Sequence, residues 1–274
     1  MNNMRPASFS ILPTMVKNLL IINGLFFISK ILFSFKNIDL DALLGLHYFA
    51  ASDFKPWQVI TYMFMHNDFG HLFFNMFALW MFGAMVENVW GARRFLIYYL
   101  ITGIGAAFIH YLIIFFQISP ELALMTQFLD APSLDTYAYM MQHCNDAILQ
   151  EAFNHNWLLL QQSPDQIDAI VNATQSIQTS YLNEFNIIGA SGSVFGILLA
   201  FGMMFPNVPI YIYFLFPIKA KWLVIIYGAL ELFYGTTGTS DGVAHFAHLG
   251  GMVFGIILIL IWRNHKFDHY RIDN

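Results

Sequence analysis

The stretch from Ile187 to Pro206, IIGASGSVFGILLAFGMMFP, constrains the fold most, because it is apolar enough to cross a membrane yet carries a serine near its start. Small residues recur through it at a spacing that places them on one stripe of a helix: Gly189, Gly192, Gly196 and Ala200. Such a stripe lets a neighbouring helix approach closely inside a membrane. The stretch therefore predicts a spanning helix whose serine, Ser191, lies against a partner helix.

The rest of the chain is also too apolar for a water-soluble domain. Of its 274 residues, 58% are hydrophobic and 11% are charged, whereas soluble domains carry about a quarter charged residues. The single cysteine, Cys144, excludes an intrachain disulfide and makes a cysteine-based metal site improbable. We expect a membrane protein with no cofactor, no bound metal and no nucleic-acid partner.

Six apolar segments predict an all-α polytopic protein with six transmembrane helices, at about 18–35, 71–87, 95–116, 187–206, 222–235 and 243–262. The first is interpreted as a retained span rather than a cleaved signal peptide. The predicted organisation is a lead, three helices with an embedded loop, an acidic insertion, three further helices and a tail: 1–17, 18–117 with loop 36–70, 118–185, 186–262 and 263–274.

The basic residues predict the orientation, because Lys and Arg prefer the cytoplasmic side. With both termini inside, nine of the twelve basic residues face the cytoplasm. The insertion at 118–185 holds eight acidic residues and no Lys or Arg, and it then lies outside as a few short helices. Compactness and the lack of a transit peptide favour the bacterial inner membrane.

Polar residues occur at similar places in the spans that start from the outer face. Ser191, His248 and Asn75 each lie about four or five residues into a span, roughly 6–8 Å below the surface at 1.5 Å per residue. A serine becomes a nucleophile when a histidine takes its proton. The sixth span carries a second stripe, Ala244, His248, Gly251 and Gly255, which could pack on the first and bring Ser191 and His248 together. Ordinary packing glycines are the alternative for either stripe alone.

The same region offers donors for an oxyanion. Ser191 lies near a helix N-terminus, where backbone N–H groups are unpaired. His71 and Asn75, at i and i+4 of the second span, could add side-chain donors. Alternatively, Asn75 forms an interhelical hydrogen bond and His71 lies at the membrane interface.

Other polar residues compete for these roles. Ser193 points away from Ser191 by roughly 160° on a helix and is interpreted as a packing residue. His245 and His248 could form a metal pair, but no carboxylate cluster accompanies them in sequence, which disfavours a zinc protease. His110 and Glu231 lie in spans without matching partners, so a helix-packing role is as plausible as a functional one.

Five motifs together resemble the rhomboid intramembrane serine proteases. They are GASG at 189–192, AHLGG at 247–251, HNDFGHLFFN at 66–75, PWQ at 56–58 and ENVWG at 87–91. The resemblance covers about 45–117 and 187–262. It implies a six-helix core, a Ser–His dyad without an acidic third member, and cleavage of transmembrane substrates.

The resemblance also implies individual roles. Ser191 would be the nucleophile and His248 the general base, with His71, Asn75 and the Ser191 N–H binding the oxyanion. Supporting positions would be Gly189, Gly192, Phe195 and Gly251. Phe195 stands where some members have a tyrosine that stacks on the catalytic histidine. His66 would be structural, residues 36–65 the embedded first loop, and 236–242 the cap over the site.

Two other functions compete with the protease. A transporter would use the aligned polar residues as a path, but the spans show no inverted repeat or pair of broken helices. A catalytically inactive rhomboid-like protein that binds membrane clients would usually lack the Ser or the His, and both are present. The expected partners are single-span membrane substrates and the bilayer; the client and the oligomeric state stay open.

Overall fold

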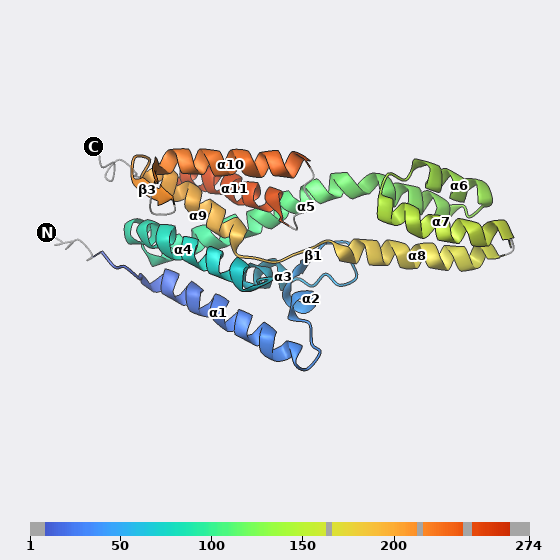
Figure 1. The fold of residues 1–274 in the computed structure, drawn as a ribbon, viewed down its shortest axis with the longest axis horizontal. Helices are drawn as coiled ribbons and strands as arrows, with labels where there is room; N and C mark the ends of the chain where they lie inside the picture. Colours follow the sequence, from blue (N-terminus) through green and yellow to red (C-terminus); the bar gives the residue numbers. More distant parts are fainter. Residues whose placement is uncertain (1–8, 163–165, 213–215, 238–242, 264–274) are drawn as a thin grey trace. The chain divides into compact units, whose positions relative to one another are not determined.

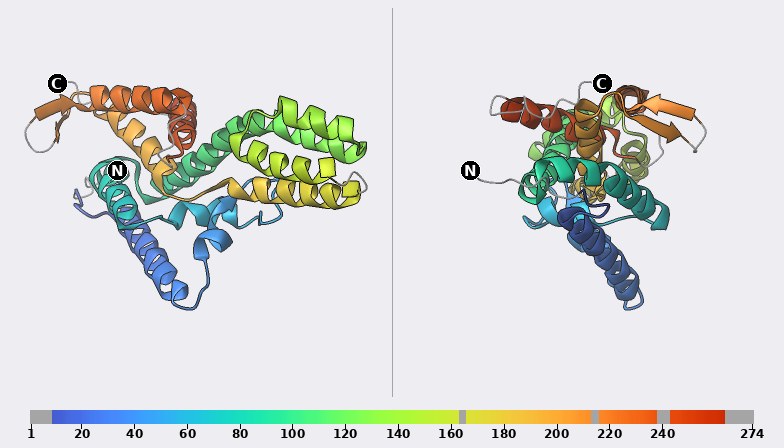
Figure 2. Two further views of the ribbon diagram at one scale, coloured as in Figure 1. Left: turned by 45° about the vertical axis from the view of Figure 1, so that its right-hand side comes forward. Right: turned by 90° about the vertical axis from the view of Figure 1, so that its left-hand side faces the viewer.

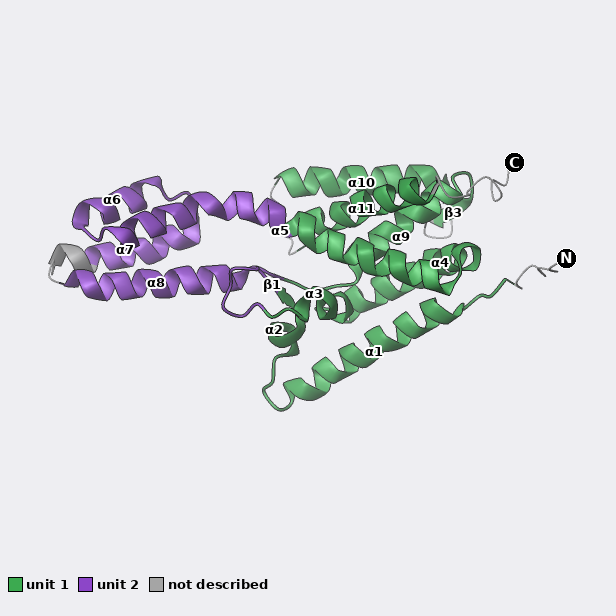
Figure 3. Cartoon of the chain, turned by 180° about the vertical axis from the view of Figure 1, so that it is seen from behind, with its two compact units in different colours: residues 1–46, 55–110, 187–274 green, residues 47–54, 111–186 purple. Residues whose placement is uncertain are grey.

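The structure is a computed structural model that describes residues 9–162, 166–212, 216–237 and 243–263. The chain forms two compact units (Figure 3). Unit 1 contains residues 1–46, 55–110 and 187–274, and unit 2 contains residues 47–54 and 111–186.

Unit 1 is a helical bundle in which α9 packs against α4 and α11, and α10 packs against α9 and α11 (Figure 1). Its elements are α1 (Thr14–Ser34), α2 (Leu40–Leu44), α3 (Gln58–Thr61), the short 3-10 helix η1 (Tyr62–Phe64), α4 (Phe69–Trp90), the first part of α5 (Ala92–Asp130), α9 (Ser191–Met204), α10 (Ala220–Thr237) and α11 (His245–Arg263). Two-residue strands, β1 (Leu46–His47) and β2 (Asn186–Ile187), lie where the chain passes between the units.

Four helices of the described residues are long and apolar enough to cross a membrane: α1, α4, α5 and α11. The fourth predicted span corresponds to α9, which is apolar but has only 14 residues. The fifth corresponds to α10, which is not among the four and carries Lys221 and Glu231. The chain is therefore a mainly helical membrane protein, while the count of six spans and the orientation stay predictions.

Two local predictions were wrong. Gly189 does not lie on a helical stripe, because α9 begins at Ser191 and Gly189 has a φ of 135°. The third helix does not end near residue 116 but continues through Pro120 to Asp130.

Between α9 and α10 the chain forms an antiparallel hairpin (Figure 2) of β3 (Pro209–Ile212) and β4 (Phe216–Lys219). Pro209 pairs with Lys219 in this hairpin.

A buried glutamate joins the first two long helices. Glu87, near the end of α4, accepts hydrogen bonds from the backbone N–H groups of Met15 and Val16, at 2.8 and 2.7 Å. These belong to the first turn of α1, whose N-terminal N–H groups have no partner within the helix. A carboxylate there also complements the positive end of the helix dipole. Asn88 adds two hydrogen bonds to the backbone of Ser10.

The segment before α4 is held by side chains that bind backbone carbonyls. Trp57 and Thr61 donate to the carbonyls of Leu43 and Leu44 at 3.2 and 2.7 Å, which ties α3 to the end of α2. Lys30 of α1 donates to the carbonyls of His66 and Asn67, at 2.8 and 2.9 Å, and pairs with Asp41 at 2.5 Å. The start of α4 is therefore fixed from α1.

Unit 2 is built from the later part of α5 with α6 (Leu134–His143), α7 (Ala147–Gln162) and α8 (Ile167–Glu184). Ser133 forms a capping box with Thr136 at the start of α6. Tyr137 is fully buried, contacts the ring of Phe128 edge-on and donates to the carbonyl of Phe153 at 3.0 Å. Burial raises the pKa of the Cys144 thiol to about 12. The unit thus has an apolar core of its own.

Candidate active site

The backbones of α9 and α11 touch where two glycines meet. A Cβ added to Gly251 would lie 1.9 Å from the carbonyl oxygen of Gly192. A Cβ on Gly192 would lie 2.4 Å from the Cβ of Ala106 in α5 and 3.6 Å from the carbonyl oxygen of Ala247. Atoms cannot approach so closely, so both positions require glycine. The two small-residue stripes therefore pack against each other, as their spacing predicted.

Ser191 and His248 both adjoin this crossing. Ser191 directly precedes Gly192, and His248 directly follows Ala247. Ser191 is the first residue of α9, ahead of the first ladder bond from Val194 N–H to the carbonyl of Ala190 at 3.0 Å. The N–H of Ser191 therefore belongs to the unpaired group at a helix start.

The positions of these residues in their helices differ from the prediction. Ser191 is the first residue of α9, His248 the fourth of α11 and Asn75 the seventh of α4. The predicted depths were counted from span limits set by hydropathy, whereas the helices begin at other residues. The common depth of these three residues therefore stays a prediction.

The ring of Phe195 stacks on the imidazole of His248. Their centroids are 4.2 Å apart and the planes are inclined by 5°. Phe195 is one helical turn after Ser191, so α9 carries both the serine and the residue that supports the histidine ring. His248 itself is 8% exposed.

Gly189 lies close to both His71 and Ser191. A Cβ added to Gly189 would lie 3.0 Å from Nε2 of His71 and 3.5 Å from Oγ of Ser191. Any larger residue would therefore crowd the imidazole and the hydroxyl, which glycine leaves uncovered. The positive φ of Gly189, together with its N–H bond to the carbonyl of Tyr62 at 2.9 Å, fixes this arrangement.

The other two predicted polar residues of this region are tied to the backbone or to aromatic neighbours. Asn75 is buried, and its Nδ2 donates to the carbonyl of His71 in its own helix at 2.9 Å. One amide hydrogen remains for another acceptor. His66 is fully buried, and its ring meets that of His71 edge-on at 5.0 Å.

Ser193 takes part in packing. It is buried and donates to the carbonyl of Tyr99 in α5 at 2.7 Å. Tyr98 in the same helix donates to the carbonyl of Gly196 at 2.8 Å. These bonds fix α9 against α5 from the side opposite the candidate nucleophile.

The sequence analysis missed the partner of Glu231. Its Oε2 accepts a hydrogen bond from Nδ1 of His245 at 2.7 Å and lies 3.0 Å from Nδ1 of His248. The prediction that Glu231 has no matching partner was therefore wrong. An acidic residue in an apolar helix, next to a His-x-x-His pair in the following one, was the signal available in the sequence.

Glu231, His245 and His248 are residue types that commonly bind metal ions. Their ligand atoms all lie within 4.8 Å of one another. Two ligands of a tetrahedral zinc ion, each at about 2.0–2.1 Å from it, would be about 3.3 Å apart. The 2.7 and 3.0 Å separations from Oε2 are shorter and fit hydrogen bonding better.

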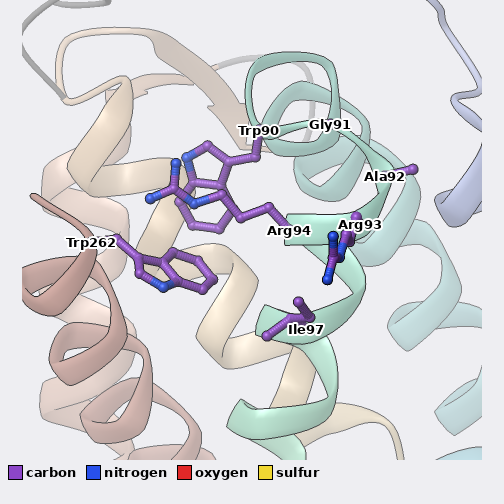
Figure 4. A pocket seen from close by; sticks show the side chains of 7 residues that line it. All are labelled: Trp90, Gly91, Ala92, Arg93, Arg94, Ile97 and Trp262. Atoms are coloured by element: carbon purple, nitrogen blue, oxygen red, sulfur yellow. The ribbon is translucent and has the colours of Figure 1, made fainter. Parts of the chain in front are cut away.

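A separate pocket lies where α4 and α11 end and α5 begins. It has a volume of about 590 Å³ and is lined by Trp90, Gly91, Ala92, Arg93, Arg94, Ile97 and Trp262 (Figure 4). The guanidinium of Arg94 lies 4.3 Å from the ring centroid of Trp262 and 5.6 Å from that of Trp90. Ser191 and His248 do not line this pocket. Of the predicted cap, 238–242 lies outside the described residues, and Thr236 and Thr237 belong to α10.

Comparison with known proteins identifies a family whose sequences match this chain. The family described as "Rhomboid domain" matches residues 53–118 and 167–265, which together are more than half of the chain. Residues 119–166, most of unit 2, lie outside the matched ranges.

Two curated relatives are similar to parts of the chain. "Rhomboid protease GluP" of Bacillus subtilis (strain 168) is 44% identical over 48 residues, 18% of this chain and 10% of that protein. "Rhomboid-like protein 11, chloroplastic" of Arabidopsis thaliana is 33% identical over 102 residues, 34% of each chain. The chain thus matches a tenth and a third of the length of these relatives.

Proposed function

This chain belongs to the rhomboid family, and on that premise we propose that it is an intramembrane serine endopeptidase. The observation that carries the proposal is the stacking of Phe195, one helical turn after Ser191 in α9, on the ring of His248 in α11. It supports the inference that Ser191 lies within reach of His248, as does the contact of Gly192 with Gly251. The name of the GluP relative, a rhomboid protease, agrees with this activity.

The proposed mechanism uses Ser191 as nucleophile and His248 as general base. His248 Nε2 takes the hydroxyl proton while Oγ attacks the substrate carbonyl, and the same proton then passes to the leaving amine. Water hydrolyses the resulting acyl-enzyme, again with His248 as base. The stacked ring of Phe195 restricts the imidazole plane during these proton transfers.

His71 Nε2 and the Ser191 N–H are the proposed donors to the oxyanion, and the remaining amide hydrogen of Asn75 supports them. A Cβ at Gly189 would lie 3.0 Å from His71 Nε2 and 3.5 Å from Ser191 Oγ, so a glycine there leaves both groups uncovered for the substrate. Asn75→Ala should therefore lower the turnover number without abolishing cleavage.

The proposed setting is a bilayer crossed six times, with both termini in the cytoplasm. Cleavage of single-span substrates then occurs near the outer face, and residues 118–185 form an extracytoplasmic insertion. The distribution of Lys and Arg supports this orientation. A bacterial inner membrane is the proposed location.

The test is cleavage of a fluorescent single-span substrate by the purified protein in detergent. We expect cleavage by the wild type, none by Ser191→Ala or His248→Ala, and near-normal cleavage by Ser193→Ala, the matched serine control. A fluorophosphonate probe should label the wild type and Ser193→Ala but not Ser191→Ala. Cleavage that persists in Ser191→Ala excludes this mechanism. Tight binding of the substrate without cleavage by the wild type would instead indicate a client-binding protein.

A further inference from the structure

Glu231 is a buried carboxylate on α10, a helix whose side chains are mostly exposed. Only four of the 18 residues of α10 are buried, and Glu231 is the one among them with an ionisable side chain. Burying a carboxylate costs free energy unless polar groups compensate it. The compensation here comes from α11, through Nδ1 of His245 at 2.7 Å and Nδ1 of His248 at 3.0 Å.

The contact with His248 is close but not yet a hydrogen bond. Nδ1 of His248 is buried and has no hydrogen-bond partner among the described residues, although Oε2 of Glu231 is within bonding distance. A small rotation of the carboxyl group or the imidazole would align the two. A carboxylate oxygen can accept from both histidines at once. His245 therefore holds the acceptor in front of His248.

We propose that Glu231 is a positioning residue for His248, so that this chain works with a Ser191–His248–Glu231 triad instead of a dyad. The proposal deepens the protease function above and rests on it. It departs from the dyad without an acidic third member that the family resemblance implies. It assigns a role to a side chain that sequence reasoning left without a partner.

The chemistry follows from the two ring nitrogens of histidine. When Nδ1–H of His248 donates to the carboxylate, the lone pair is on Nε2, the tautomer needed to take the Ser191 proton. The proton moves from Oγ to Nε2 as the bond from Oγ to the substrate carbon forms, and it leaves Nε2 with the amine. Glu231 keeps its charge throughout and stabilises the imidazolium between these two transfers.

The experiment compares the full-length wild type with Glu231→Gln and Glu231→Asp, using the fluorescent single-span substrate in detergent. Active molecules are counted by fluorophosphonate labelling, so that loss of folded protein is separated from loss of turnover. We expect Glu231→Gln to lower kcat about 10- to 100-fold with KM nearly unchanged. Glu231→Asp keeps the charge and should recover part of kcat.

The matched control is Glu87→Gln. Glu87 is also buried and also accepts two hydrogen bonds, but its donors are backbone N–H groups of α1. Its substitution should lower the number of active molecules and leave kcat per active molecule unchanged.

The pH profile separates positioning from a structural role. His245, His71 and His110 are the other titratable side chains whose charge acts near His248 or Glu231, and all remain in every variant. Removing the carboxylate charge should move the rising limb of kcat/KM to lower pH by about one unit or more. Glu231→Asp and Glu87→Gln should keep the wild-type limb.

Three outcomes overturn the proposal. The first is a Glu231→Gln protein with wild-type kcat and pH limb. The second is a lower kcat with an unmoved limb, which indicates support of the fold only. The third is a wild type that loses activity with a chelator and regains it with zinc, which makes the cluster a metal site. In each case, inactivity of Ser191→Ala still upholds the protease. If the wild type neither cleaves the fluorescent substrate nor reacts with the fluorophosphonate probe, the proposed protease function itself is contradicted.

Discussion

The two helices that pack on α11 differ in how they are held, although each contributes a side chain next to His248: Phe195 from α9 and Glu231 from α10. In α9, ten of 14 residues are buried, and its glycines meet backbone or side chains of α5, α10 and α11. In α10, four of 18 are buried, and large apolar side chains such as Trp222 and Phe233 are exposed. The helix that carries Ser191 is therefore placed by packing, whereas Glu231 is placed by hydrogen bonding.

The space around individual glycines shows how differently the two helices are held. A methyl group on Gly251 would meet a backbone oxygen of α9 at 1.9 Å, and backbone cannot move aside without moving the helix. A methyl group on Gly228 of α10 would meet only the flexible end of Met252 at 3.4 Å, an ordinary contact. Substitutions at matched positions should therefore have unequal costs.

The largest effect is expected from Gly251→Ala. The added methyl group forces α9 and α11 apart, so the free energy of unfolding should fall by about 3 kcal/mol or more and cleavage should be lost. Reversible unfolding in mixed micelles, with the substrate assay, measures both.

Gly228→Ala is the matched control. It should change stability by less than about 1 kcal/mol, in the stabilising direction if helix propensity dominates. Equal losses in the two variants would mean that α10 is held as tightly as α9.

An intermediate effect is expected from Gly202→Ala, which lies where α9 meets α10. Its methyl group would be 2.4 Å from Cγ2 of Val224. Because most of α10 faces outward, the helix can shift to relieve the clash, and we expect a loss of about 1–2 kcal/mol with cleavage retained. A loss as large as that of Gly251→Ala would contradict the weaker attachment of α10. Reversible unfolding of Gly202→Ala and Gly251→Ala in mixed micelles measures the two losses.

A smaller effect is expected from Tyr98→Phe. It removes a buried hydrogen bond to the carbonyl of Gly196 and should cost about 1 kcal/mol. Tyr227→Phe on α10, where the side chain is 45% exposed, should cost less than about half of that. If Tyr227→Phe proved the more harmful, α10 would carry more of the stability than its exposure indicates.

Helical spacing predicted part of this arrangement. The stripes that contain Gly192 and Gly251 follow from helical periodicity, and the structure packs them together. The stacking of Phe195 on His248 was implied by the rhomboid resemblance. Glu231 was missed because its partner depends on the rotation of α10 about its own axis. That rotation is set by a few tertiary contacts and leaves no periodic pattern in the sequence.

Backbone features were missed for a different reason. Gly189 has the spacing of a helical stripe, but its N–H donates to the carbonyl of Tyr62 and its φ is 135°. This backbone conformation is not helical, so α9 begins only at Ser191. The hairpin β3–β4 was not predicted, and it contains Pro209 and Pro217, a residue type that is rare inside strands. Pro209 is the first residue of its strand, where a missing N–H is tolerated.

The hydrogen bonds from α1 to Glu87 also bear on how the protein is made. Synthesis proceeds from the N-terminus, so α1 emerges from the ribosome before residue 87 exists. Until α4 arrives, the N–H groups of Met15 and Val16 have no carboxylate to bind. The hydrogen bonds by which Glu87 caps α1 can therefore form only after α4 has been synthesised, so a nascent chain stalled before residue 87 lacks them.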